Sequence, residues 1–134
     1  QSLKEPEIKV GNLNTRRDFT YVEDTTEAMT AALQTPNIEG EIINIGTSKA
    51  WKMKEILHLI KKETNTEHKK VVLDKSRLRP NDVDTLVADF KKARKILNWK
   101  PKITLNEGIQ KTLTWFNKND QMWGYEKRRW RWRY

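Results

Sequence analysis

Short β-branched runs alternate with helical segments along this chain, and only about three such runs are visible in its 134 residues. They lie at residues 7–10, 41–46 and 70–73, and the glycines that bound the middle run predict a buried strand there. Three strands are few for a sheet that must support several helices. The alternation predicts an α/β or α+β class, of which we favour α/β. The low strand count indicates part of a larger sheet-containing protein, or a half that completes itself by association.

Helix signals separate these runs. Asp24 is expected to be an N-cap, because Glu27 follows three residues later as in a capping box. Trp99 ends the third helical segment and is expected to pack in the core, since large aromatic side chains dominate buried area. The predicted helices cover residues 24–33, 52–63, 89–97 and 104–117.

The composition excludes several classes of site. The chain has no cysteine, which excludes disulfides, thiolate metal sites and a cysteine nucleophile. His58 and His68 lack partners at ligand spacing, so we expect both on the surface and predict no metal site. No apolar run approaches the roughly 18 residues of a membrane helix. The first ten residues show no signal-peptide core, and we expect a cytoplasmic location without a membrane partner.

The net charge of +9 is concentrated at the C-terminal end, where residues 125–134 carry five Lys and Arg against Glu126. We therefore divide the chain into a body, residues 1–119, and a basic aromatic tail, residues 120–134. Interleaved arginine and tryptophan suit RNA or single-stranded DNA, on which rings stack and cations meet phosphates. The same residues suit packing against a parent enzyme or a second subunit. We favour packing over nucleic-acid binding or a disordered end, and keep a non-enzymatic nucleic-acid-binding module as the alternative function.

Motifs that would carry chemistry are absent from the sequence. It contains neither G-x-G-x-x-G nor G-x-x-x-x-G-K-[ST], so no glycine-rich loop is present to hold a phosphate. No tyrosine is followed by a lysine four residues later, the spacing that lets an ammonium lower a phenol pKa on one helix face. We therefore predict no catalytic residue and no cofactor site in this chain.

Two arginine-containing loops are the candidate binding features. Arg17 and Arg79 lie on non-repetitive segments beside apolar strands, a placement that can aim a planar guanidinium at a phosphate. Asp82 would repel a phosphate unless it faced another group, such as the diol of a ribose. The competing interpretation is that the arginines form surface ion pairs with Asp18, Asp82 or Asp84. Spacing alone leaves both interpretations open and slightly favours the second.

Short motifs around these loops occur in a definite order. They are GNL at 11–13, RDFTYVED at 17–24, INIG at 43–46, RPNDVD at 79–84, AD at 88–89, KA at 92–93, LNWKP at 97–101 and TLNEGI at 104–109. From about residue 9 to 116 the chain resembles the C-terminal part of extended short-chain dehydrogenase/reductases that act on nucleotide sugars. The NAD-dependent 4,6-dehydratases and related epimerases are the most similar members.

The resemblance implies specific roles. It implies the C-terminal portion of an extended Rossmann-type fold without the N-terminal Rossmann core, and a UDP-, GDP- or dTDP-linked sugar as ligand. Arg17 and Arg79 would bind the nucleotide diphosphate, and Asp82 would contact the ribose. NAD or NADP and the Tyr/Lys pair would belong to the N-terminal half of a full-length parent. We therefore expect this chain alone to bind no cofactor and catalyse no turnover, and we expect a homo-oligomer.

Two positions depart from the family pattern. Residues 49–52 read Lys-Ala-Trp-Lys where a small hydroxyl residue usually opens the following helix. Arg16 replaces an uncharged residue before Arg17. The first departure leaves open whether the local ligand contacts match those of the family. Arg16 either adds a contact to the phosphate or is solvated.

Overall fold

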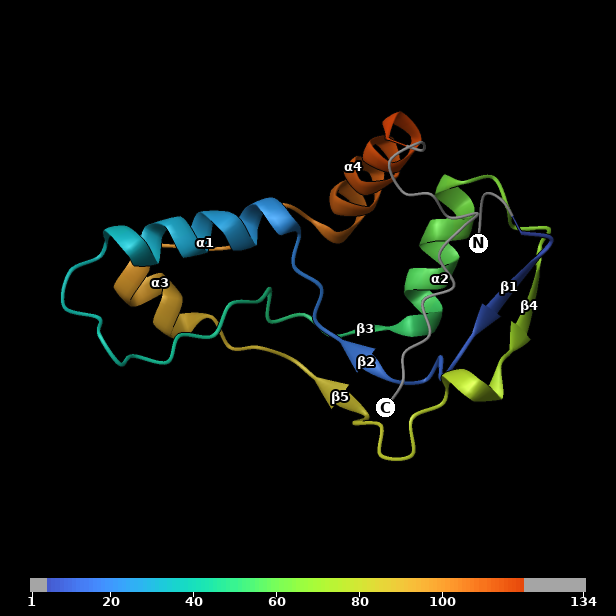
Figure 1. Cartoon of the computed structure of the whole chain (residues 1–134), viewed down its shortest axis with the longest axis horizontal. Helices are drawn as coiled ribbons and strands as arrows, with labels where there is room; N and C mark the ends of the chain where they lie inside the picture. The colour runs from blue at the N-terminus through green and yellow to red at the C-terminus, as the bar shows by residue number, and fades with distance from the viewer. Residues whose placement is uncertain (1–4, 120–134) are drawn as a thin grey trace.

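The computed structural model describes residues 5–119 and confirms the α/β class (Figure 1). The predicted tail and the boundary at residue 120 therefore lie outside the described residues. The strands are β1 (Glu7–Val10), β2 (Arg16–Arg17), β3 (Trp51–Lys52), β4 (Lys70–Leu73) and β5 (Thr85–Leu86). The helices are α1 (Val22–Gln34), α2 (Met53–Glu63), the 3₁₀ helix η1 (Lys75–Arg77), α3 (Lys91–Leu97) and α4 (Leu105–Lys118).

The strands form two small sheets. Strands β1 and β4 pair in parallel, while β2 lies between β3, its antiparallel neighbour, and β5, its parallel neighbour. Figure 1 shows the three-stranded sheet between one end of the molecule, formed by α1 and α3, and the other, formed by α2, β1 and β4. Strand β2 thus pairs with two segments, β3 and β5, that lie far from it in the sequence.

The largest buried cluster joins α1 to α3. Ala28 of α1 packs with Ala93 and Leu97 of α3 and with Trp99, which is 4% exposed. The ring of Phe90 meets Trp99 edge to face, with centroids 6.1 Å apart. The prediction that Trp99 packs in the core is confirmed.

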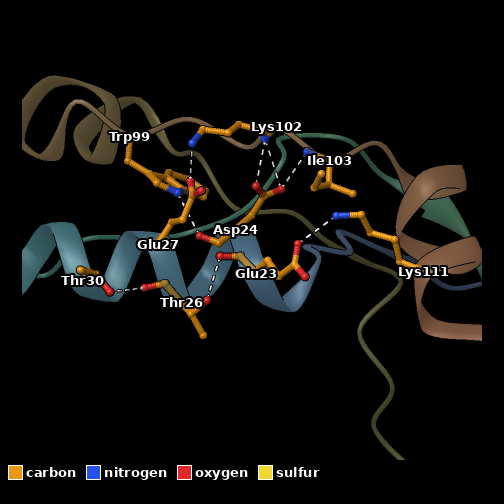
Figure 2. A network of polar contacts seen from close by, with 9 residues as sticks. All are labelled: Glu23, Asp24, Thr26, Glu27, Thr30, Trp99, Lys102, Ile103 and Lys111. Atoms are coloured by element: carbon orange, nitrogen blue, oxygen red, sulfur yellow. Dashed lines mark hydrogen bonds and ion pairs between the residues drawn. The ribbon is translucent and has the colours of Figure 1, made fainter. Parts of the chain in front are cut away.

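Asp24 does not cap a helix, and that prediction is wrong. Helix α1 begins two residues earlier, at Val22, and Asp24 is 2% exposed within its first turn. Its carboxylate accepts hydrogen bonds from the backbone amides of Lys102 at 3.1 Å and Ile103 at 3.0 Å (Figure 2). The indole Nε1 of Trp99 donates to the Asp24 backbone carbonyl at 2.9 Å. The carboxylate of Asp24 thus accepts from backbone amides of a distant segment and not, as the sequence pattern predicted, from the first turn of its own helix.

The strand predicted at residues 41–46 is also wrong. Ile43 and Ile45 pack against the cluster around Trp99, whereas Ile42 is 82% exposed. The run has the composition of a strand, but no described segment forms a ladder with it. Because a strand requires a hydrogen-bonded neighbour, the local pattern alone does not make one here.

The capping box predicted for the last helix is confirmed. The Glu107 amide donates to Thr104 Oγ1 at 3.3 Å, and the Thr104 amide donates to Glu107 Oε2 at 2.8 Å. The Thr104 hydroxyl, which donates to Glu107 Oε2 at 2.7 Å, and the Thr104 amide hold the pKa of the Glu107 carboxyl below its usual value. Within residues 5–119, no helix is long and apolar enough to cross a membrane.

Replacing Asp24 by Asn should destabilise the fold. The variant turns an amide NH₂ toward the donors of Lys102 and Ile103, so at least one buried N–H loses its acceptor. We expect a loss of about 2–3 kcal/mol in the free energy of unfolding, measured by urea denaturation.

Glu23→Gln is the matched control, since it removes an exposed carboxylate one residue away that pairs with Lys111 at 2.9 Å. It should cost less than about 1 kcal/mol. Equal losses for the two variants would contradict the role assigned to Asp24.

Candidate functional site

Arg17 is the final residue of β2, in a short strand rather than on the non-repetitive backbone expected for it. Its Nη2 donates to Oδ1 of Asp82 at 2.6 Å, and the two side chains are 22% and 19% exposed. Its Nη1 donates to the backbone carbonyls of Val83 at 2.6 Å and Arg16 at 2.8 Å. The structure therefore brings together two of the three predicted site residues, as the ion pair that the competing interpretation named.

Arg79, the third predicted residue, lies on the loop between η1 and β5, as expected. Its side chain is exposed, and within the described residues no ion pair or hydrogen bond is recorded for it. Asp82 follows three residues later on the same loop. Arg17 and the loop that carries Arg79 therefore meet at Asp82.

Hydrogen bonds of Asp74 and a close approach of Gly11 fix the start of this loop. Asp74 accepts hydrogen bonds from the amide of Ser76 at 3.0 Å and from its hydroxyl at 2.6 Å. These two bonds lower the pKa of the Asp74 carboxyl. A Cβ at Gly11 would lie 2.7 Å from the carbonyl oxygen of Arg77, so only glycine permits this close approach. The loop with Arg79 and Asp82 thus leaves a defined position beside the end of β1.

Asp18 holds the other side of the site. Its carboxylate accepts from the amides of Thr47 at 2.9 and 3.0 Å and Ser48 at 2.9 Å, and from the Thr47 hydroxyl. The amide of Ala88 donates to it at 3.4 Å. A Cβ at Gly46 would lie 2.7 Å from Asp18 Oδ2, so only glycine fits at this position. Sequence reasoning offered Asp18 only as a surface partner of arginine and missed this role.

The structure also contains two cavities away from these residues. An apolar one of about 310 Å³ lies between α2 and α4 and is lined by Phe19, Tyr21, Ile60 and Phe116, among others. The other, of about 450 Å³, lies beside α1 and Trp99. Neither is lined by Arg17, Arg79 or Asp82. Among the described residues, no group of three or more His, Cys, Asp or Glu could hold a metal ion.

The sequence pattern that defines GDP-mannose 4,6 dehydratase matches residues 1–112. The chain belongs to the GDP-mannose 4,6 dehydratase family. Members of this family and their structural neighbours are NAD-dependent nucleotide-sugar epimerases and dehydratases, which confirms the resemblance seen in the sequence.

Individual relatives agree with this assignment. Mouse dTDP-D-glucose 4,6-dehydratase is 40% identical over 116 residues, which are 81% of this chain and 31% of the mouse protein. Human GDP-mannose 4,6 dehydratase is 32% identical over 121 residues, covering 77% and 32%. The structure of Thermotoga maritima UDP-glucose 4-epimerase with UDP-glucose is similar at a TM-score of 0.76 and 30% identity, covering 84% and 35%. This family member thus spans about a third of the length of these relatives, and its fold corresponds to part of a Rossmann-type enzyme.

Asp18→Asn should loosen the loops beside Arg17. The substitution places an NH₂ group where the amides of Thr47, Ser48 and Ala88 need acceptors. We expect a loss of about 2 kcal/mol in the free energy of unfolding. Amide hydrogen exchange should become faster at residues 47, 48 and 88.

Asp84→Asn is the control, because the Asp84 side chain is exposed and the residue contributes its backbone carbonyl to Arg16. It should leave exchange at residues 47 and 48 unchanged. Faster exchange at these residues in the control as well would show that Asp18 has no special role.

Proposed function

We propose that this family member is the substrate-binding portion of an NAD- or NADP-dependent nucleotide-sugar 4,6-dehydratase or epimerase, and that it binds the nucleotide diphosphate. The observation that supports this most is the fixed orientation of Arg17 at the loop that carries Arg79. A guanidinium held in place loses little side-chain entropy when a phosphate binds.

The hydrogen bonds of Arg17 leave part of its guanidinium available. A guanidinium has five N–H donors, and three of those of Arg17 are directed at Asp82, Val83 and Arg16. The remaining donors, on Nε and Nη2, can bind two oxygens of a phosphate. Arg79 is exposed on the facing loop and supplies a second cation. Two arginines match the two negative phosphates of a nucleoside diphosphate better than one would.

The carboxylate of Asp82 can lie near a bound phosphate without strongly repelling it. One of its oxygens bonds to Arg17, and the resulting neutralisation reduces its repulsion of a nearby phosphate. No bond is recorded for the second oxygen within the described residues. That oxygen can accept from a ribose hydroxyl, so the ion pair and the ribose contact are compatible functions of one carboxylate.

The chemical step is assigned to residues outside this sequence. Relatives with solved structures contain NAD or NADPH, and that of Bacillus cereus UDP-glucuronic acid 4-epimerase contains NAD. The present sequence has no glycine-rich dinucleotide motif and no Tyr-x-x-x-Lys pair. We propose that the full-length parent binds the cofactor elsewhere, acts in the cytoplasm as a homo-oligomer, and that the 134 residues alone catalyse no turnover.

Titration calorimetry with UDP, GDP and dTDP tests the binding claim. Arg17→Ala and Arg79→Ala should each weaken the affinity for the best of these ligands by about tenfold or more, because each removes charged hydrogen bonds to phosphate. Arg94→Ala is the control, since Arg94 is an exposed arginine on α3 at the far end of the molecule. It should bind like the unaltered chain.

Two results would contradict the proposal. One is the absence of binding heat with all three ligands in a sample that circular dichroism shows to be folded. The other is an equal loss of affinity in all three arginine variants, which would indicate a general charge effect rather than a site.

A further inference from the structure

Trp51 lies directly across from Arg17 in the three-stranded sheet. The antiparallel register of β2 and β3 pairs Arg17 with Trp51, and the parallel register of β2 and β5 pairs Arg17 with Leu86. Residues that are directly paired across strands project from the same face of a sheet. Trp51, Arg17 and Leu86 therefore form a row on one face, with the arginine in the middle.

Trp51 is not part of the core cluster of the fold. It is half-buried, and the tryptophan of that cluster is Trp99. Trp99 and Trp115 each have an aromatic partner, Phe90 and Phe116, whereas no ring contact is recorded for Trp51 among residues 5–119.

The indole face of Trp51 is also not covered by Arg17. The guanidinium of Arg17 turns toward Asp82 and Val83, on the side of β5 and away from β3. In the described part of the chain, the recorded cation–π contact is that of Lys111 with Tyr21. The accessible part of the half-buried indole thus lies beside the arginine proposed to bind the diphosphate.

We propose that Trp51 is a specificity-determining residue on whose indole ring the nucleobase of the ligand stacks. This inference rests on the proposed function and adds the base to the diphosphate already assigned. Directly opposed side chains begin about 5 Å apart at Cβ, so Trp51 lies within reach of the base of a nucleotide whose diphosphate is held at Arg17. Every base has a π face, so stacking strengthens nucleotide binding without requiring hydrogen bonds to the base. A purine covers more of the indole than a pyrimidine does, so GDP gains more than UDP.

The test compares GDP, UDP and inorganic pyrophosphate in titration calorimetry, with circular dichroism as a check of folding. Trp51→Ala should weaken GDP and UDP by about tenfold, more for GDP, because stacking on one base contributes that much. Pyrophosphate affinity should change by less than about twofold, since this ligand has no base. Trp51→Phe retains a ring and should recover most of the nucleotide affinity.

Trp115→Ala is the control, because Trp115 is a tryptophan on α4, 43% exposed and remote in sequence from the sheet. It should bind all three ligands like the unaltered chain. The inference is overturned if Trp51→Ala binds both nucleotides normally, or if it loses pyrophosphate and nucleotides equally. If the unaltered folded chain binds none of the three, the proposed function itself fails. If the unaltered chain binds and Trp51→Ala binds equally well, the stacking role is wrong but the proposed diphosphate binding stands.

Discussion

The buried carboxylate of Asp24 ties α1 to the segment between α3 and α4 through the amides of Lys102 and Ile103. Asp18, six residues earlier and half-buried, does the same for the loops at residues 47–48 and 88. Burying a charge is costly unless hydrogen bonds replace its water, so each carboxylate accepts only a narrow set of positions for its donors. Two such carboxylates in one short segment fix how β2 and α1 meet the rest of the chain.

The candidate site depends on this arrangement more than on a large core. Few hydrophobic side chains are buried in the described residues, and the main cluster lies between α1 and α3, away from Arg17. Arg17 is oriented by groups on its own strand and on the loop that carries Arg79, and Asp18 beside it fixes the neighbouring backbone. A site held by directional hydrogen bonds keeps its geometry at the surface, where apolar packing alone would be weak.

Local patterns predicted the elements whose causes are local. The strands at residues 7–10 and 70–73 and the capping box of Thr104 and Glu107 occur as expected, and the helix predicted at 52–63 occurs at 53–63. The sequence also located the loop of Arg79. It did not predict the roles of Asp18 and Asp24, because their donors lie about 30 and 80 residues further along the chain. The sequence contains both partners, in the motifs R-D at 17–18 and N-I-G-T at 44–47, but only the fold shows that Asp18 accepts from the Thr47 amide.

The error at residues 41–46 has a different origin, which also bears on α1. A β-branched run becomes a strand only when another strand pairs with it. Its sequence therefore predicts a buried surface, but not that the run forms a strand by itself. The outer side of α1 shows the same property, because Val22, Met29 and Leu33 recur at helical spacing and are exposed, the last at 89%. Ile42 and this side of α1 are apolar surfaces that the described residues do not cover. Exposed apolar surface of this kind is typical of places where another segment or protein packs.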